Sequence, residues 1–567
     1  MRKFQVFSLA VALIANGALA LAQDVDPGER LLEEERRQRQ MEELAGNSAG
    51  QVITTPDAKG PVSEALCFPI EEIALSGITV FPDTRFAAML AEFNGRCLGQ
   101  ASIGNLLARI SAVYADEGYI TTRAYVPAQD IGTRKLTIEV LEGRVEAYVY
   151  RQVDEKGAAT PGKPRKIKSA FPLQVGEVFQ LRDIEHGLEQ MNRLRSSQAN
   201  ANLIAGEAPG TSQVVITEKK VDTIRGTVGL DNRGNAATGQ TQIRFGLEAD
   251  DLLQINDVWS LSFSGSENTN ALAFAVSAPY GKWLFSLNGS YSEELSPVTI
   301  LSDLFTQSAG VNLTAERLLA RNARSKYFGY VTASSYWNER YINIASLTPQ
   351  HRSALRFGLR HEHRLEKAVI AAETSLSTGI KLFGADWDAS GLPPGSPRTK
   401  FEKLESRLTY IRPYESGRQL SVFFSGQLAS APLFSNEQVS IGGWDSVRGY
   451  SGYAFSGDSG LFVRTELSFP AVDIDLRNWG AGLKKADIWN PFDKAQGGFR
   501  AFGFLDGGYA KSRATGQSAT MFSAGLGFST QIGKATLNGA LAVPLHDQGG
   551  QTAGDLQSFI GLTVKVF

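Results

Sequence analysis

From about Val221 to Phe567, short runs of residues alternate between apolar and polar, and Gly, Asn, Asp and Ser separate the runs. Four runs show the pattern most clearly, with apolar residues at Trp259, Leu261 and Phe263; Trp283, Phe285 and Leu287; Leu461, Val463, Leu467 and Phe469; and Ile560, Leu562, Val564 and Val566. Successive side chains of a strand point to opposite faces. Each run is therefore predicted to be a strand with one apolar face and one polar face.

A soluble β-sandwich has the same alternation, so three other features are needed to predict a membrane barrel. The polar faces are rich in Ser, Asn and Arg, as a water-filled lumen requires. Aromatic residues crowd the strand ends, as in interfacial girdles: Tyr280, Trp283, Tyr327, Tyr330, Trp337 and Tyr341. The chain also ends on a strand with a terminal aromatic, although Phe567 falls on the face opposite to Ile560. We therefore expect a mainly β protein, with a transmembrane barrel of about 16 antiparallel strands over residues 220–567.

Composition excludes several functional classes. The 57 basic and 59 acidic residues nearly balance, which argues against a nucleic-acid binder. With 2 Cys and 5 His, there is little material for a thiol or imidazole metal centre, and we expect no metal and no cofactor.

Enzymatic motifs are missing from the sequence as well. The one Gly-x-Ser-x-Gly pattern, at 46–50, lies in a segment rich in small and polar residues and not between a strand and a helix, so it is no nucleophile elbow, and there is no phosphate-cradling glycine loop. His361 and His363 place two imidazoles on one strand face, which without a third ligand favours a surface or lumen strand over a metal site. Asp473 and Asp475 are interpreted as an acidic pair in a loop.

The N-terminus has the three parts of a secretory signal peptide. Arg2 and Lys3 precede an apolar segment, and an Ala-x-Ala sequence at 20–22 predicts cleavage after Ala22, which makes residues 1–22 the signal. An exported chain can form disulfides, and Cys67 and Cys97 are the two cysteines that this chain has.

Two small α/β domains are predicted before the barrel, at 67–143 and 144–219. The first has strands at Ile70–Leu75, Ile120–Val126 and Lys135–Leu141, a helix at Asp83–Phe93, and a second helix that Ser102 would cap. The second has strands at Val145–Val153, Asn200–Ala205 and Gln213–Glu218, a loop at Lys156–Pro164, and a helix at Leu181–Leu194. Each domain is expected to be a sheet covered by helices on one face.

The segment at 23–45 differs from everything that follows it. Between Gly28 and Leu44 it mixes many Glu and Arg residues with few apolar ones, a composition that favours a helix. One interpretation is a solvated helix or a disordered leader, and the other is a removable helix that occupies a polar pore. A linker rich in Gly, Ser, Thr and Pro follows at 46–66.

In this order, the segments resemble the outer-membrane transporters of two-partner secretion. These are the TpsB components, or haemolysin secretion/activation proteins, within the superfamily that joins POTRA domains to a barrel. The motifs that carry the resemblance are Cys67–Ile70 through Cys97–Gly99, Gly118–Ala124 with Val126–Gln129, Leu230–Gly234 with Thr238–Gly239, Val447–Tyr450, and Phe504–Gly508. The resemblance implies a disulfide between Cys67 and Cys97 in the first POTRA domain. It also implies that the region around Val447, Arg448, Gly449 and Tyr450 is the signature loop and that Phe504, Asp506 and Gly508 lie on the strand facing it.

Side-chain chemistry supports this pairing independently. A long loop that folds back into a lumen needs an anchor, and Arg448 offers a rigid fork of donors to a carboxylate such as Asp506. Glu466 is a rival partner at a polar position of a nearby strand. Phe502 and Phe504 alternate along the strand with Asp506 and would therefore face the lumen with it. Packing of Tyr450 against one of these two rings would explain why aromatic residues face inward there.

The function implied by the resemblance is a protein-conducting pore in the outer membrane of a Gram-negative bacterium. Its POTRA domains would recognise a large secreted exoprotein, such as an adhesin or haemolysin, in the periplasm, and strand addition to an exposed sheet edge is the expected mode. The alternative is a factor of the same superfamily that assembles barrels in the membrane, although such factors carry more POTRA domains. A passive solute porin has no need for two periplasmic domains.

Overall fold

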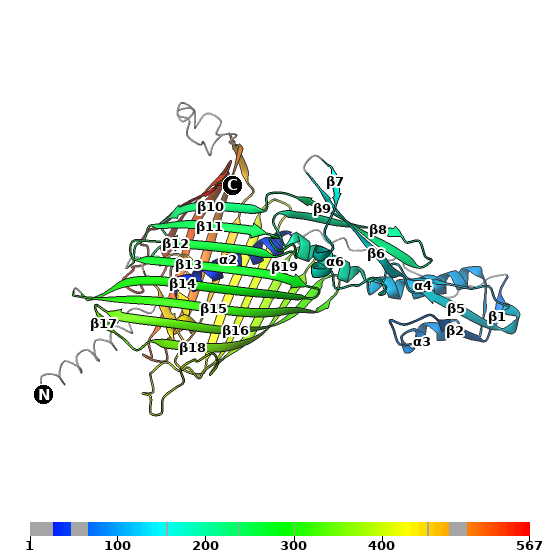
Figure 1. The fold of residues 1–567 in the computed structure, drawn as a ribbon, viewed down its shortest axis with the longest axis horizontal. Helices are drawn as coiled ribbons and strands as arrows, with labels where there is room; N and C mark the ends of the chain where they lie inside the picture. The colour runs from blue at the N-terminus through cyan, green and yellow to red at the C-terminus, as the bar shows by residue number, and fades with distance from the viewer. Residues whose placement is uncertain are drawn as a thin grey trace.

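The computed structural model describes residues 26–46, 66–154, 157–235, 238–299, 301–450, 453–475 and 496–567. The predicted signal peptide at 1–22 and most of the linker at 46–66 lie outside these ranges. Figure 1 shows a large barrel from which two small α/β domains extend at one end, with helix α2 (Pro27–Gly46) inside the barrel.

The barrel is closed and antiparallel, because each strand pairs with its neighbours and β10 pairs with β29. Its strands are β10 (Ile224–Asp231), β11 (Gln242–Asp250), β12 (Val258–Gly265), β13 (Thr269–Tyr280), β14 (Trp283–Thr299), β15 (Ser302–Arg321), β16 (Ser325–Ile342), β17 (Ala345–Ser346), β18 (Gln350–Arg364), β19 (Val369–Ile380), β20 (Glu402–Pro413), β21 (Gln419–Ala429), β24 (Ser459–Ser468), β25 (Val472–Asp475), β26 (Gln496–Lys511), β27 (Ser518–Ile532), β28 (Ala535–Pro544) and β29 (Gln557–Lys565). The short β17 and β25 do not count as separate strands of the wall, since β16 also pairs directly with β18 and β24 with β26. In the part of the chain that the structure describes, the wall thus has sixteen strands, and the predicted fold class is confirmed.

The alternation in the sequence corresponds to the two faces of this wall. Leu247 and Leu261 are register partners and are exposed on the outer surface, whereas Asp506 and Phe504 of β26 are buried on the inner side. Asp473 and Asp475 belong to β25, so the interpretation of these residues as a loop pair was wrong. None of the described helices has the length and apolar character needed to cross a membrane.

The first α/β domain joins a three-stranded sheet to two helices. The sheet has the order β2 (Glu72–Ser76), β5 (Lys135–Leu141), β4 (Arg123–Tyr125), and β1 (Phe68–Ile70) pairs separately with β3 (Arg96–Leu98). The helices are α3 (Thr84–Ala91) and α4 (Gln100–Asp116). Phe86, Leu106 and Tyr114 are fully buried in the core. The disulfide between Cys67 and Cys97 is present, with 5.2 Å between the Cα atoms, and it fastens β3 to the residue before β1.

Two details of this domain differ from the prediction. Helix α4 begins earlier than expected, with Gly99 in an extended conformation at the N-cap, so Ser102 lies buried within the first turn and is not the cap. Glycine tolerates the N-cap position well, and the apolar periodicity alone did not reveal the extra residues. The strand expected at Ile120–Val126 is confined to β4, because the chain before it is a turn.

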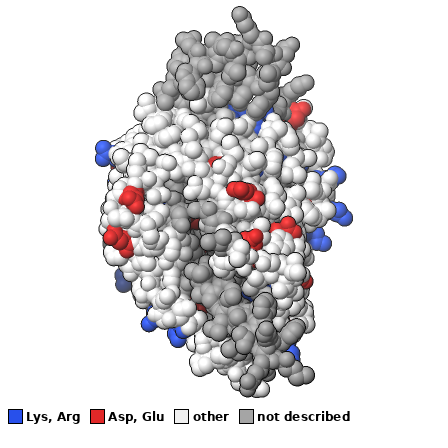
Figure 2. Space-filling model, turned by 90° about the vertical axis from the view of Figure 1, so that its left-hand side faces the viewer, with Lys and Arg blue, Asp and Glu red and all other residues white. Residues whose placement is uncertain are grey.

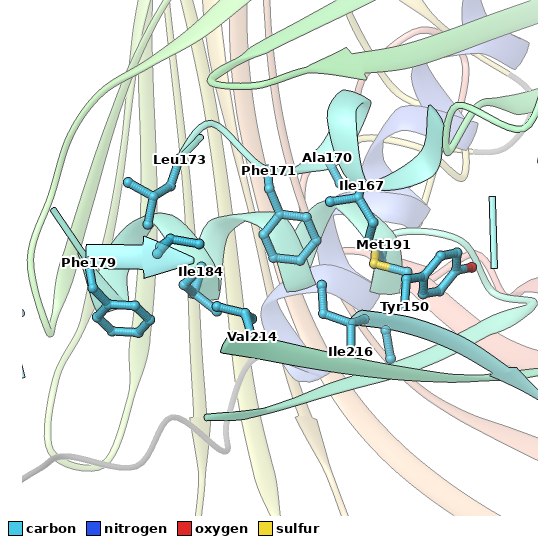
Figure 3. Close-up of a cluster of buried hydrophobic side chains, with 12 residues drawn as sticks. Tyr150, Ile167, Ala170, Phe171, Leu173, Phe179, Ile184, Met191, Val214 and Ile216 are labelled. Carbon is cyan, nitrogen blue, oxygen red and sulfur yellow. The ribbon is translucent and has the colours of Figure 1, made fainter. Parts of the chain in front are cut away.

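The second α/β domain is a four-stranded sheet with two helices. Its strand order is β7 (Ala159–Pro161), β6 (Arg144–Val153), β9 (Thr211–Lys220), β8 (Ser197–Ala205), and the helices are α5 (Pro164–Ala170) and α6 (Leu181–Asn192). Figure 3 shows the core, in which Phe171, Ile184 and Met191 face Val214 and Ile216 of β9. The segment predicted as a loop at Lys156–Pro164 contains β7, and α5 starts at Pro164, where proline at the first helical position favours initiation.

Candidate transport site in the barrel lumen

Helix α2 lies along the lumen and is bound to the wall chiefly by ion pairs. Arg36 donates to both carboxylate oxygens of Glu373 at 2.9 and 3.0 Å. Glu34 accepts from Arg233 at 2.8 Å and from Arg244 at 2.7 Å. Two further pairs are Arg407–Glu33 at 2.7 Å and Arg39–Glu248 at 3.1 Å. The partners belong to both sides of the lumen, so charged residues hold the helix from two directions.

Helix α2 has an apolar cluster near its C-terminal end, and Leu31 nearer its N-terminal end is also buried. Leu44 is buried with Ala371 and Ile411, and Met41 packs against the same cluster. The helix and the surrounding wall enclose a cavity of about 940 Å³. Because the helix is held mostly by polar contacts, it can leave without exposing a large apolar surface.

The segment between β21 and β24 (430–458), which we call the inward loop, folds back into the barrel. It contains the turn η3 (Ser435–Glu437) and a small hairpin of β22 (Val439–Ile441) and β23 (Phe455–Gly457). Lys403 of the wall donates to the side chain of Glu437 at 2.7 Å, and Asp458 accepts from the backbone of Leu433 at 2.6 Å. These contacts hold the loop within the barrel and not over its rim.

Arg448 and Asp506 form the central contact of the inward loop. The Nε of Arg448 donates to Oδ2 of Asp506 at 2.7 Å and its Nη2 to Oδ1 at 2.9 Å, while the backbone N–H adds a third bond at 3.2 Å. Arg448 also donates through Nη1 to Glu466 at 3.0 Å, so both candidate partners are bound at once. Only 2% of Arg448 and 4% of Asp506 is exposed, which makes this a shielded, bidentate pair.

Aromatic rings complete the pocket of Arg448. Its guanidinium lies 3.7 Å from the ring centroid of Phe504 and 5.8 Å from that of Trp444. The packing of Tyr450 against Phe502 or Phe504 that we expected was wrong. Tyr450 packs instead in a separate cluster with Val447 and Met521, and its hydroxyl donates to the carbonyl of His546 at 2.6 Å.

Two positions at this contact are glycines because the loop and the wall lie too close together there for a side chain. A Cβ on Gly449 would lie 2.6 Å from the Cβ of Ser523, and one on Gly508 would lie 3.0 Å from a methyl carbon of Val447. Real Cβ contacts of 2.6 Å do not occur without movement of the backbone. Gly449 therefore lets the loop lie directly against β27.

A third set of contacts joins the second α/β domain to the barrel mouth. Lys166 of α5 is buried between Glu218 at 2.5 Å and Asp251 at 3.1 Å. Burial alone would raise the pKa of Glu218, but the ammonium group of Lys166 holds that pKa below its usual value. His186 of α6 contacts the carbonyl of Gly281, and burial lowers its pKa to about 4.

The α/β domain also reaches α2 directly. Arg195 donates to Glu42 of the helix at 2.5 and 3.0 Å and to Glu248 of the wall at 3.3 Å. The sequence analysis did not identify these residues, nor Asp445 and Trp444 of the inward loop. In the sequence, the one signal for a role of Trp444 and Asp445 was their position just before Val447.

His361 and His363 lie on β18, on the outer face of the wall. His361 stacks on Tyr327 with 4.3 Å between ring centroids, in the manner of an interfacial aromatic residue. Within the described ranges, no group of three His, Cys, Asp or Glu side chains is placed to hold a metal ion.

Comparison with known proteins identifies the family of this chain. A sequence model described as haemolysin secretion/activation protein ShlB/FhaC/HecB matches residues 210–530. The chain belongs to this family. Residues 68–143 match the ShlB-type POTRA domain and residues 145–204 match a second POTRA domain model.

Individual relatives are similar over most of their length. The outer membrane transporter CdiB of Dickeya dadantii is 29% identical over 82% of this chain and 84% of its own. The hemolysin transporter protein ShlB of Serratia marcescens is 25% identical over 78% of its sequence. Among solved structures, CdiB from Escherichia coli superposes with a TM-score of 0.82 at 27% identity, covering 97% of this chain and 98% of that one.

The family places the protein in the outer membrane, with both POTRA domains in the periplasm. The barrel end that carries the POTRA domains is therefore periplasmic, and the opposite end faces outward (Figure 1). Figure 2 shows that outer end, where uncharged residues predominate among the described atoms and most Lys and Arg lie near the margins.

Proposed function

We propose that the protein is the pore of a two-partner secretion system, which recognises an unfolded exoprotein in the periplasm and conducts it to the cell surface. The observation that carries the proposal is the lumen, which runs through the barrel and holds a polar helix and a folded loop. Membership of a family whose members include hemolysin transporters supports it.

Helix α2 would be the resting plug that leaves during transport. Its contacts with the wall are mostly ion pairs, which water and new partners can replace one at a time. Wall residues such as Arg233, Arg244 and Glu373 then become available to a polar chain in transit. An unfolded polypeptide needs such a wet, mixed-charge path, because its backbone groups must stay hydrogen-bonded.

Recognition would occur on the POTRA sheets. Strand β8 is an edge of the second POTRA sheet in the described structure, and Leu203 and Ile204 on it are 40% and 48% exposed. An extended exoprotein segment can add to such an edge through backbone hydrogen bonds. Because β8 begins two residues after Arg195, which holds Glu42, docking there would act close to the end of α2.

Export of a partner tests the proposal. A candidate partner is a large secreted protein whose gene neighbours the gene of this chain, and both would be produced in a Gram-negative host lacking other transporters of this type. We expect the partner at the cell surface or in the medium only when the transporter is present. The proposal is wrong if the partner reaches the surface equally well without it, or if the transporter instead restores the assembly of unrelated barrels.

A further inference from the structure

The periplasmic turn between β11 and β12 (251–257), which we call the rim turn, has an unusual backbone. Asp251, Gln254 and Asn256 have φ of 60°, 60° and 59°, a left-handed conformation that residues other than glycine rarely adopt. The carboxylate of Asp257 braces the turn by accepting from the backbone of Leu253 at 3.1 Å and from the indole of Trp259 at 2.6 Å. Such strain persists only where surrounding contacts impose it.

One side of the rim turn is fixed to the second POTRA domain. Asp251 pairs with Lys166 at 3.1 Å and with Lys220 at 2.9 Å. The side-chain amide of Asn256 donates to the carbonyl of Lys166 at 2.8 Å, and the backbone carbonyl of Asn256 accepts from Arg193 at 2.6 Å. Asn256 is fully buried, so this side of the turn belongs to the domain interface.

The other side of the rim turn displays two leucines. Leu252 and Leu253 are 53% and 54% exposed, although Asp251, Asn256 and Asp257 of the same turn are buried. They lie at the periplasmic end of the apolar outer face of the barrel, since the turn joins β11 and β12, which carry the exposed register pair Leu247 and Leu261. Apolar tips that extend a lipid-facing surface are matched to lipid and not to water.

The depth of these leucines agrees with a lipid contact. Leu252 lies three residues beyond Ala249, the register partner of the half-buried Trp259. At about 3.3 Å per residue for a fully extended chain and a strand tilt near 45°, Leu252 lies at most about 7 Å farther toward the periplasm than Ala249. The headgroup region of a bilayer is also about 5–7 Å thick on each side.

We propose that Leu252 and Leu253 insert into the periplasmic leaflet of the outer membrane. The same turn holds the POTRA domain through Asp251 and Asn256, so the lipid contact fixes the orientation of that domain relative to the membrane plane. The occupant of this surface is phospholipid, and the proposal depends on the outer-membrane location but not on the exoprotein.

Spin labels test the insertion in phospholipid nanodiscs. The two native cysteines form a disulfide, so Leu252→Cys supplies the thiol to be labelled. The controls are Leu526→Cys on the outer face of β27, which is 70% exposed, and Val175→Cys in the second POTRA domain, which is 60% exposed. We expect a ratio of oxygen collisions to collisions with a water-soluble nickel chelate between the values at Leu526 and Val175, because the headgroup region lies between hydrocarbon and water. A label as open to nickel as at Val175, or one shielded from both reagents, would overturn the insertion.

A distance measurement tests the consequence for the POTRA domain. Labels at Val175 and Leu526 together report the position of this domain relative to the wall. In the Leu252→Asp, Leu253→Asp background, we expect a several-fold broader distance distribution in nanodiscs, with the heat resistance of the barrel retained. An unchanged distribution would show that the rim turn does not orient the domain.

Discussion

Arg37 of the lumen helix donates to both the backbone carbonyl and the side chain of Asp445, at 3.2 Å in each case. Asp445 lies three residues before Arg448, so the helix holds the inward loop close to its main anchor. Arg464 of the wall donates to the same carbonyl at 3.2 Å. Departure of α2 would therefore remove the two hydrogen bonds that Arg37 donates to Asp445 and leave the one from Arg464.

We predict that the pair of Arg448 and Asp506 is required for export. Loss of one partner leaves the other charge shielded and unpaired, which costs about 3–5 kcal/mol when burial is complete. Because Glu466 also binds Arg448, Asp506→Ala should impair export less than Arg448→Ala. Export assays on both variants, beside the exposed control Arg418→Ala, would show this order. Wild-type export from both variants would exclude the anchoring role.

We predict that reversing the charge of Glu34 opens the pore. Glu34→Arg places a third guanidinium beside Arg233 and Arg244, and the repulsion should expel the helix from that wall. The control is Gln38→Arg, which introduces the same guanidinium group at an exposed position of α2. Planar-bilayer recordings should show a higher open probability for Glu34→Arg alone. Equal conductance in both variants would mean that the helix does not obstruct the pore.

The buried Lys166 should be essential for the POTRA–barrel interface. Its replacement by Ala leaves Glu218 and Asp251 without a shared cation, at a cost of about 3–5 kcal/mol. Lys168→Ala on the same helix removes an exposed lysine and should cost under about 0.5 kcal/mol. Hydrogen exchange of the α5 and α6 amides measures both effects, and similar exchange in the two variants would contradict the prediction.

Acid should weaken the same interface through His186. Burial lowers the pKa of His186 to about 4, against an ordinary value of about 6.5. The neutral ring is thus favoured in the docked state, so stability is fully present above pH 6.5 and falls as the pH drops toward 4. The upper limit of the loss is about 3 kcal/mol. His186→Gln should flatten this pH dependence of α6 amide exchange, and an unchanged profile would assign the dependence to other groups.

Local chemistry explains which features the sequence predicted. Alternation over many strands predicted the barrel, since a strand exposes its period directly, and α3 was predicted close to its observed range. The start of α4 was wrong because a glycine cap has no side-chain signal. The short strand β7 and helix α5 were missed because three to seven residues carry too little periodicity.

The contacts of the candidate site were likewise predicted only in part. Arg448 and Asp506 could be paired from their motifs and charges, because a buried guanidinium needs a carboxylate. The position of Tyr450 was wrong, since which aromatic ring meets the guanidinium depends on the path of the loop. The contacts of Glu34, Arg37 and Arg195 depend on the register of α2 in the lumen, which local sequence does not encode.

Locking α2 in place tests the account most directly. A Cβ on Gly28 would lie 2.9 Å from the Cβ of Ser290, close enough for Gly28→Cys and Ser290→Cys to form a disulfide after a small shift. We predict that the oxidised double variant inserts normally but exports no partner, and that reduction restores export. Each single variant, treated with the same reductant, controls for reduction of the native disulfide. Full export with the cross-link formed would contradict transport through a pore that α2 vacates.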